Sequence, residues 1–558
     1  MTQQAKSKLK ILFVTEASFL SSGFANYTRE LLNRLYKTNK YHIAEFASYG
    51  LVNDPRDKDI PWRYYANAVN ENDPRYQEYT SRTDNQFGRW RFEKVLLDFK
   101  PDIVCDIRDY WMSSYQALSP LRKYFHWILM PTVDSAPQQE EWIDTFLSAD
   151  SILTYSDWGA NVLKEQSSGK INYIDTVSPG VDLDIFKPIA DKSGLKNKLG
   201  IPQDSIVIGS VMRNQKRKLF PELMASFRSC LDKLDQTNPK LSSKLYLYLH
   251  TSYPDAGWDI PELLKINRLS NKVLFSYSCR SCSCLTSTVY SGPIKVCPSC
   301  LNKTMVLPSV TAGISNDRLA EVYNIFDLYV QYSICEGFGL PQVEAGACGV
   351  PIVTVNYSAM VDVVNKLEAI PIQPKTYFKE LETKAIRVYP DNEQLANEII
   401  KFLSQPQESI NKQKIRVREL TEKHYHWDDI TKKWENHLDY LDKTYRSNWS
   451  KPAKFLQPIK TKENLDPSQN WDYIKHICQN NLDESSMIGS MNILTILQQA
   501  DYGFSVHGAQ ITKHDYKDIE AFTNTLISNW NNSEQVRAQN VKFDDDFIRY
   551  ANIKDQTS

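Results

Sequence analysis

The chain has 558 residues, and its 66 lysines and arginines balance 67 aspartates and glutamates to a formal net charge of −1. At roughly 100–200 residues per domain, this length predicts three to five structural units. A hydrophobic fraction of 42% and an aromatic fraction of 12% exclude wholesale disorder. The neutral balance argues against a protein that coats nucleic acid through bulk charge, but it is compatible with a local basic groove.

The sequence carries no signal for membrane insertion or export. The first apolar run, 11–14, is too short for the core of a signal peptide, and no later run is long enough to span a membrane. Ten cysteines are too few for a disulfide scaffold, and five of them crowd between Cys279 and Cys300. We therefore expect a cytoplasmic protein (host cytoplasm, if the source is viral) with one metal site and no membrane insertion.

Apolar runs alternate with helical patterns in two successive stretches of the chain. Continuous apolar strands separated by helices are typical of a parallel sheet covered on both faces. The predicted strands are 9–14, 103–107, 127–130 and 152–155 in the first stretch, and 206–212, 245–249, 273–275, 328–331 and 352–355 in the second. This pattern predicts two doubly wound α/β units. Ligands of such sheets bind at the carboxyl ends of the strands. The expected site is a cleft between the two units.

The segment from Cys335 to Pro351 is the most informative part of the sequence. A predicted strand runs into the loop Glu336-Gly-Phe-Gly-Leu340, and a helix is expected to begin near Pro341, since proline suits a first helical turn. The free N–H groups of such a loop and helix start attract phosphate, and glycines let an anion approach the backbone closely. Glu336 and Glu344 lie eight residues apart and could accept hydrogen bonds from sugar and ribose hydroxyls. A surface loop and a solvated helix face are the alternative interpretation.

This segment resembles the E-x7-E signature of retaining glycosyltransferases of family 4, which have the two-domain GT-B fold. The resemblance covers roughly residues 9–441, including 178–188 at the exit from the first domain and 211–218 at the opening of the second. It implies a nucleoside-diphosphate sugar as donor, retention at the anomeric carbon and no catalytic metal. It also implies that Glu336 positions the sugar. The loop Gly337, Phe338, Gly339 and Leu340, together with Glu344 and Gly23 of the first domain, is implied to bind the nucleotide sugar.

The same resemblance places two cations on the donor diphosphate. Arg213 and Lys218 match those positions, and Lys216 or Arg217 would serve in an alternative alignment. Cations that face a helix N-terminus neutralise a departing nucleoside diphosphate. We therefore expect Glu336, Arg213 and Lys218 to form the catalytic group.

The acceptor is expected to meet the first domain. Asp106, Arg108 and Asp109 follow one predicted strand and Asp134 follows another, so all four are candidates for lining the cleft. Capping of the following helices explains them equally well. Between positions 62 and 92 arginines alternate with aromatic residues, a composition that stacks bases or sugars. Such spacing more often belongs to a core with arginines at its rim.

The cysteine-rich stretch predicts a metal site. Cys279-x2-Cys282 and Cys297-x2-Cys300, separated by 14 residues, match the four thiolates of a structural zinc ribbon. Cys284 offers a second choice in the first knuckle, and Cys282 is preferred because a two-residue gap forms the usual metal-gripping turn. A group of ordinary buried cysteines is the alternative.

The expected architecture is therefore an α/β GT-B protein with added parts. Its predicted units are an acceptor domain (1–188), a donor domain (189–430) with a zinc-ribbon insertion (276–309), a crossover helix (431–450) and a mostly helical C-terminal extension (451–558). The expected activity is glycosyl transfer from a nucleotide sugar to a hydroxyl. Two alternatives stay open: the acceptor is a hydroxymethylated base in DNA, since the chain faintly resembles DNA-modifying glycosyltransferases of large phages, or the protein is a non-catalytic binding module.

Overall fold

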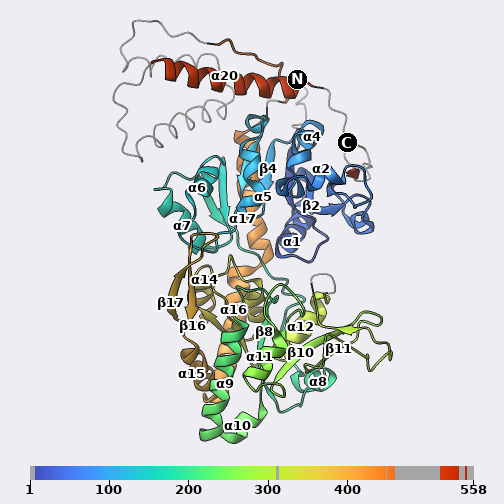
Figure 1. Cartoon of the computed structure of the whole chain (residues 1–558), viewed down its shortest axis with the longest axis vertical. Helices are drawn as coiled ribbons and strands as arrows, with labels where there is room; N and C mark the ends of the chain where they lie inside the picture. Colours follow the sequence, from blue (N-terminus) through green and yellow to red (C-terminus); the bar gives the residue numbers. More distant parts are fainter. Residues whose placement is uncertain (1–6, 310–312, 448, 459–515, 540–546, 550–558) are drawn as a thin grey trace.

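Two mainly parallel sheets, one above the other along the long axis, organise the molecule in the computed structural model (Figure 1). The structure describes residues 7–309, 313–447, 449–458, 516–539 and 547–549. We call the part built on β1–β7 the N-terminal lobe and the part built on β8–β16 the C-terminal lobe. Within the described residues, no helix is both long enough and apolar enough to cross a membrane.

The N-terminal lobe contains an eight-stranded sheet in the order β19-β3-β2-β1-β4-β5-β6-β7. All neighbours are parallel except β19, which pairs antiparallel with β3. The strands are β1 Leu9–Glu16, β2 Tyr41–Leu51, β3 Arg63–Ala68, β4 Ile103–Asp106, β5 His126–Leu129, β6 Ser151–Thr154, β7 Tyr173–Thr176 and β19 Ile548–Arg549. The helices are α1 Gly23–Lys37, α2 Tyr76–Thr80, α3 Thr83–Gln86, α4 Arg89–Phe99, α5 Tyr110–Ala117, α6 Glu140–Leu147 and α7 Asp157–Gln166.

The C-terminal lobe contains a nine-stranded sheet in the order β12-β13-β10-β9-β8-β14-β15-β16, with β11 paired to β10. The strands are β8 Ile206–Val211, β9 Leu245–His250, β10 Val273–Cys279, β11 Leu285–Val289, β12 Ile294–Lys295, β13 Met305–Val306, β14 Leu328–Gln331, β15 Ile352–Val355 and β16 Ile370–Ile372. A separate hairpin joins β17 Pro374–Lys379 to β18 Ile386–Pro390. The helices are α8 Lys192–Lys198, α9 Phe220–Thr237, α10 Pro239–Lys244, α11 Ile260–Ile266, α12 Asn316–Asn324, α13 Leu340–Ala347, α14 Met360–Leu367, α15 Asn392–Leu403 and α16 Gln407–Tyr425.

The chain crosses between the lobes twice, and the two crossings touch. The first crossing includes Val181, whose N–H donates to the carbonyl of Tyr425 at 2.9 Å on the second. Helix α17 (Trp427–Thr444) begins there, capped by His426, and returns to the N-terminal lobe. Trp434 of this helix is buried and donates to the Tyr27 hydroxyl at 2.8 Å. Helix α17 therefore overlaps the crossover helix expected at 431–450, although it begins and ends a few residues earlier.

Two C-terminal segments lie against the N-terminal lobe. Helix α20 (Tyr516–Ala538) brings Glu534 to within 3.1 Å of Lys123, and β19 covers the outer edge of β3. The rest of the predicted helical extension, 459–515 and the stretches around β19, lies outside the described residues.

The strands expected from apolar runs are present, but several others lacked that signal. β2 carries the buried Glu45 between apolar residues, and this carboxylate accepts hydrogen bonds from Ser18 and Trp62. β3 lies within the arginine–aromatic stretch. Both strands are buried by packing partners from elsewhere in the chain, which local apolar periodicity does not reveal.

Candidate active site

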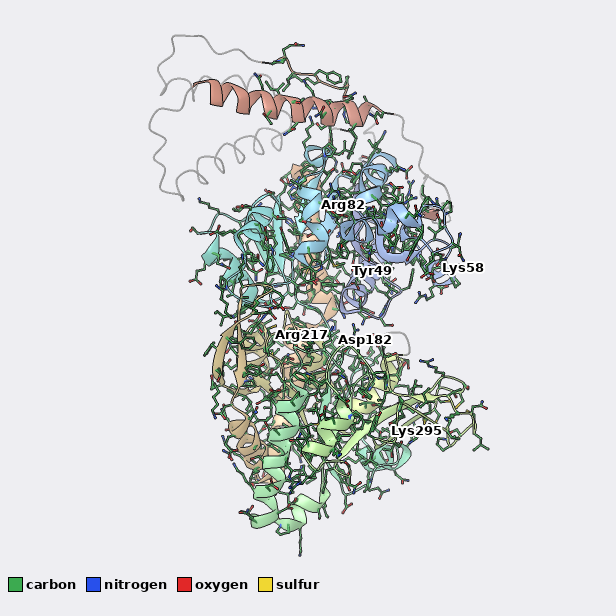
Figure 2. All side chains as sticks on the ribbon, in the orientation of Figure 1. Tyr49, Lys58, Arg82, Asp182, Arg217 and Lys295 are labelled. Atoms are coloured by element: carbon green, nitrogen blue, oxygen red, sulfur yellow. The ribbon has the colours of Figure 1, made fainter. Side chains whose placement is uncertain are left out.

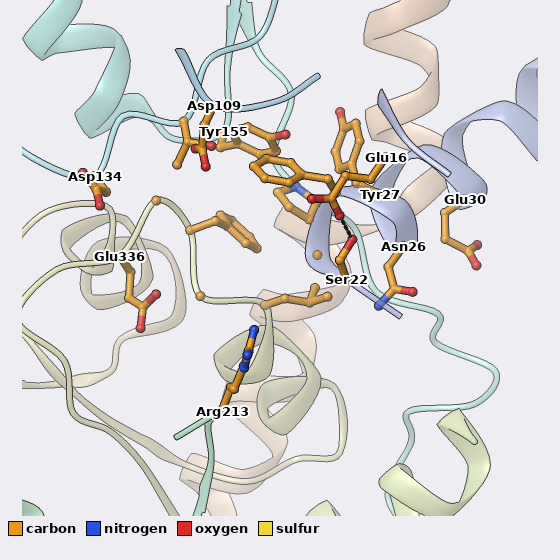
Figure 3. A pocket seen from close by; sticks show the side chains of 18 of the residues that line it. Glu16, Ser22, Asn26, Tyr27, Glu30, Asp109, Asp134, Tyr155, Arg213 and Glu336 are labelled. Atoms are coloured by element: carbon orange, nitrogen blue, oxygen red, sulfur yellow. Dashed lines mark hydrogen bonds between the residues drawn. The ribbon is translucent and has the colours of Figure 1, made fainter. Parts of the chain in front are cut away.

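A cleft of about 670 Å³ lies between the carboxyl ends of the two sheets, where the fold predicts a ligand site (Figure 3). Residues of both lobes line it, and Arg217 and Asp182 lie at the level where the lobes face each other (Figure 2). The sequence-predicted residues on its walls are Gly23, Asp109, Asp134, Arg213, Glu336, Gly337, Phe338, Gly339, Leu340 and Glu344. Lys218, Asp106 and Arg108 are not among the lining residues.

The two glycines of the loop before α13 are needed for different reasons. Gly339 has φ +88°, a left-handed conformation that glycine adopts without strain. A Cβ at Gly337 would lie 2.3 Å from Cγ2 of Thr132 in the opposite lobe, so only glycine fits this close approach. Pro341 stands in the first turn of α13, as expected. The loop thus brings a helix N-terminus and its free N–H groups to the cleft.

Glu336 is the centre of a buried network at the end of this loop. Its Oε1 accepts from Lys218 Nζ, from the Ser333 hydroxyl at 2.6 Å and from Gln331 at 2.7 Å. Its Oε2 contacts Arg217 Nη1 at 2.8 Å. Burial by itself would raise the pKa of Glu336, but Lys218 and Arg217 outweigh it and hold that pKa well below its usual value. The carboxylate is therefore ionised at neutral pH.

The cations of the 213–218 segment occupy different positions. Arg213 is half-exposed on the cleft wall and is held by Asp255, with Nε and Nη2 each 3.0 Å from a carboxylate oxygen. Arg217 lines the cleft as well. Lys218 is buried behind Glu336, and burial lowers its pKa. In this structure the cations that face the cleft from this segment are thus Arg213 and Arg217, the latter being one of the alternatives that the sequence left open.

Glu344 lies on α13 farther along the same wall. Its Oε2 accepts a hydrogen bond from the Tyr323 hydroxyl at 2.6 Å. Burial raises its pKa to about 7, although the Tyr323 hydrogen bond acts in the opposite direction. The side chain is therefore present in both its protonated and its ionised form near neutral pH.

The N-terminal lobe contributes an acidic wall to the cleft. Glu16 ends β1 and accepts a hydrogen bond from the Ser22 hydroxyl, next to Gly23 at the start of α1. Burial, with smaller contributions from the carboxylates of Asp134 and Glu16, raises the pKa of Asp109 to about 7. Asp134 is held across the lobe boundary by Arg387, whose Nη1 lies 3.1 Å from Oδ1.

Asp106 and Arg108 do not belong to the acceptor side, which corrects the sequence expectation for these two residues. Both are fully buried and form an ion pair with each other. Arg108 also donates to the Ser48 hydroxyl at 2.6 Å and to the Phe87 carbonyl at 2.5 Å. This pair ties β4 to neighbouring elements, whereas Asp109, at the N-cap position of α5 but without a side-chain capping bond, lines the cleft.

The arginine–aromatic stretch is mainly core. Tyr64, Tyr65 and Arg91 are buried, and Trp62 donates to Glu45 at 2.8 Å. The guanidiniums of Arg75 and Arg91 lie over the ring of Phe547, just before β19. The packing interpretation holds for these residues, which leaves them no free face for a base or a sugar.

Sequence reasoning missed several residues of the cleft. Glu16, Thr132 and Tyr155 stand at or just after the ends of parallel strands, and that position was the available signal. Arg387 gave no local signal, because its link to Asp134 joins residues 253 positions apart.

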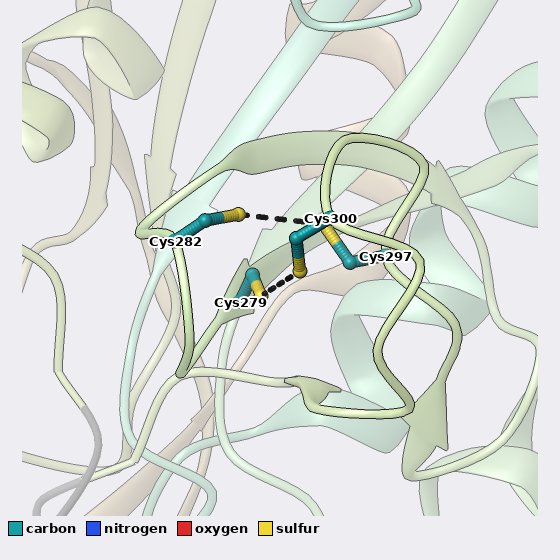
Figure 4. A group of neighbouring side chains, drawn as sticks. All are labelled: Cys279, Cys282, Cys297 and Cys300. Atoms are coloured by element: carbon teal, nitrogen blue, oxygen red, sulfur yellow. Dashed lines mark hydrogen bonds between the residues drawn. The ribbon is translucent and has the colours of Figure 1, made fainter.

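The four predicted cysteine ligands lie together, at the turns that follow β10 and β12 (Figure 4). Their sulfurs are all within 4.8 Å of one another, with 3.6 Å between Cys279 and Cys300 and between Cys282 and Cys297. Cys279 is the last residue of β10, so the first knuckle continues a core strand directly. Cys284 lies outside the group and accepts from Ser299 instead.

Comparison with known proteins gives matches among glycosyltransferases. Residues 309–419 match the family described as glycosyl transferases group 1. The D-inositol 3-phosphate glycosyltransferase 2 of Catenulispora acidiphila is 25% identical over 217 residues, 39% of this chain and 42% of the relative. The chain thus aligns with about two-fifths of the length of this relative.

Solved structures resemble the chain more widely. Sucrose-phosphate synthase from Thermosynechococcus elongatus matches with a TM-score of 0.56 and 16% identity, covering 78% of this chain and all of that one. Anabaena HepE in complex with UDP-glucose matches with a TM-score of 0.54 and 14% identity over the same shares. The chain therefore has a GT-B-like α/β fold, and its residues 309–419 match the glycosyl transferases group 1 family.

Proposed function

We propose that this protein is a retaining glycosyltransferase that moves a sugar from a nucleoside-diphosphate sugar to a hydroxyl acceptor. The observation that carries the proposal is the convergence of Arg213, Arg217, Glu336, the α13 N-terminus and Glu344 on one wall of the cleft. The similar HepE structure is a complex with UDP-glucose, which supports a nucleotide sugar as the donor here. The E-x7-E resemblance supports retention.

The residues of this wall suit the departure of a diphosphate. Guanidiniums bind phosphate oxygens in a bidentate manner, and Arg213 is already oriented by Asp255. As the bond to the anomeric carbon breaks, negative charge develops on the leaving oxygen. Arg213, Arg217 and the N-terminal end of α13 stabilise that charge where it forms.

Glu336 is suited to position the transferred sugar. A carboxylate offers about four lone-pair sites. Oε1 already receives three donors, whereas Arg217 is the side chain that contacts Oε2 among the described residues. Oε2 therefore keeps capacity for a sugar hydroxyl. Glu344 can accept from the ribose hydroxyls at the far end of the donor.

Incubation with a panel of nucleotide sugars tests the proposal. At least one should stabilise the protein thermally and release a nucleoside diphosphate, with the anomeric configuration of the product retained by NMR. Arg213→Ala and Glu336→Gln should each lower turnover by about ten- to a hundredfold, the loss expected for one charge-assisted hydrogen bond.

Arg228→Ala is the matched control, because this arginine pairs with Asp232 on α9 and does not line the cleft. Full turnover in the Arg213 and Glu336 variants would refute the assignment. Donor binding without any turnover would favour the non-catalytic alternative.

A structural zinc ion at Cys279, Cys282, Cys297 and Cys300 is a separate part of the proposal. Zinc–sulfur bonds of about 2.3 Å in a tetrahedron place the sulfurs about 3.8 Å apart, and the 3.6 Å separations here fit that geometry. Purified protein should contain one zinc per chain, and Cys297→Ser should lose it. Cys284→Ser is the control that keeps it, and unchanged zinc in Cys297→Ser would refute the site.

A further inference from the structure

The acceptor side of the cleft differs sharply in charge from the donor side. Among the described lining residues between β1 and β7, four carry carboxyl groups: Glu16, Glu30, Asp109 and Asp134. Glu30 pairs with Arg34, Asp134 pairs with Arg387, and Asp109 has a pKa of about 7, so their negative charge is reduced but not removed. Arg29 is the cation among them, and its guanidinium already donates to two backbone carbonyls and, at 2.6 Å, to Asn26. The wall therefore has an excess of negative charge.

Helix α1 does not offset this charge. Its N-terminus opens onto the cleft at Gly23, where an anion could otherwise bind. The Ser22 hydroxyl accepts the N–H of Ala25 at 3.2 Å and donates to Glu16. A carboxylate of the protein thus already stands beside this helix end.

Arg387 offsets the charge of Asp134 only in part, because it is shared with Glu380. It reaches the cleft from the C-terminal lobe, but its side chain is buried and bonded to Asp134 and to Glu380 at 2.8 Å. An adjoining hollow contains Arg34, Lys37 and Lys432 together with Glu30, Asp182, Asp428 and Glu435. The cations there are matched by carboxylates, and Arg34 is 2.6 Å from Glu30.

Aromatic rings accompany the carboxylates on this wall. Tyr110 and Trp142 stack with centroids 5.2 Å apart, and Trp111 is 54% exposed. Aromatic faces pack against the C–H faces of a sugar, and carboxylates accept strong hydrogen bonds from hydroxyls. A phosphate requires the opposite, namely free guanidiniums, ammoniums or backbone N–H groups.

We propose that the acceptor is a polyhydroxylated molecule without phosphate or another anionic group, and that Glu16, Asp109 and Asp134 select it. This inference rests on the proposed glycosyltransferase function and names the substrate class of that site. Phosphate stands in the names of the inositol and sucrose enzymes to which the chain is similar. The carboxylates of this wall would repel such a group, and they would repel the phosphates of DNA equally.

Matched pairs of acceptors test the inference on the full chain with the nucleotide sugar that it uses. The pairs are glucose and glucose 6-phosphate, fructose and fructose 6-phosphate, and myo-inositol and its 3-phosphate, with a duplex containing hydroxymethylated bases as a further acceptor. The neutral member of at least one pair should be glycosylated with a kcat/KM about tenfold or more above its phosphorylated partner, a difference of about 1.4 kcal/mol. Preference for a phosphorylated partner, or transfer to the duplex, would overturn the inference.

A panel in which no neutral acceptor reacts, although nucleoside diphosphate still binds, also counts against the inference. Loss of nucleotide binding altogether would instead refute the proposed function, so the two failures are distinguishable.

Charge removal provides the second measurement. The double variant Glu16→Gln/Asp109→Asn should lower the ratio of kcat/KM between the neutral and the phosphorylated acceptor of a pair by about tenfold. Its affinity for the nucleoside diphosphate should stay unchanged. Asp428→Asn is the matched control, because this exposed carboxylate lies in the adjoining hollow and not on the cleft wall. Discrimination that the double variant leaves intact would show that these carboxylates do not select the acceptor.

Discussion

Lys218 and Arg217 both contact Glu336, yet we predict that their removal has different consequences. The Lys218 side chain is 9% exposed and that of Glu336 is 5% exposed, whereas Arg217 is 41% exposed. Lys218→Met strips a buried carboxylate of its buried partner, which typically costs about 3–5 kcal/mol. Ser333 and Gln331 still donate to Glu336, so we expect a loss near the lower end, about 3 kcal/mol. Arg217→Met breaks a pair open to water, which costs about 1 kcal/mol or less.

Urea unfolding and calorimetric titration with the preferred nucleoside diphosphate separate the two effects. Lys218→Met should lower the unfolding midpoint clearly. Arg217→Met should change stability little but weaken diphosphate binding by about tenfold or more, because a charge-assisted contact in the cleft is lost.

The double variant Lys218→Met/Glu336→Gln is the internal control. It removes both buried charges and should recover part of the stability lost in Lys218→Met. A Lys218→Met protein as stable as the wild type, or an Arg217→Met protein with full diphosphate affinity, would refute this division of roles.

Three further outcomes are expected. Gly337→Ala should lower turnover, because the new Cβ meets Thr132 across the cleft, and Thr132→Ser should restore it by removing Cγ2; an active single variant would contradict the close approach. Glu344→Gln should alter the pH dependence of stability: with a pKa raised from 4.5 to about 7, wild-type Glu344 keeps its proton in the folded state, so wild-type stability falls between pH 4.5 and 7. Measured by urea unfolding, the free energy of unfolding of the variant should exceed that of the wild type by up to about 3 kcal/mol at pH 8 and by little at pH 5. An equal difference at both pH values would refute the raised pKa. Phe547→Ala should cost about 3–5 kcal/mol, since the ring is buried and packs against the guanidiniums of Arg75 and Arg91; a loss below about 1 kcal/mol would mean that this packing contributes little.

The donor wall was predictable because its chemistry is contiguous in sequence. The loop before Pro341, its two glycines and the two glutamates stand within nine residues, so spacing alone placed them at one helix start. Which cation faces the cleft was not predictable. Arg217 and Lys218 are neighbours, and only the contact of Lys218 with Glu336 shows that it is turned inward.

The residues of the acceptor wall could not be predicted in the same way, because their neighbours come from other parts of the sequence. The sequence does not distinguish Asp106, Arg108 and Asp109, because all three are charged residues at the end of one predicted strand. The first two have buried partners. Ser48 and Phe87 bond to Arg108 from earlier parts of the chain, and Gln116 of the following helix bonds to Asp106. The clustering of carboxylates likewise joins the ends of separate strands, which become neighbours only when the sheet order is known.

The contact between Val181 and Tyr425 brings the two covalent crossings between the lobes to one junction. Non-covalent contacts join the lobes as well, among them the pair of Asp134 with Arg387 and the bonds from the N–H groups of Asp157 and Trp158 to Asp362. A rotation of the lobes about an axis through the junction would leave the covalent links in place but would require such contacts to break. The Asp134–Arg387 pair lines the cleft, so its separation would be one cost of widening the mouth.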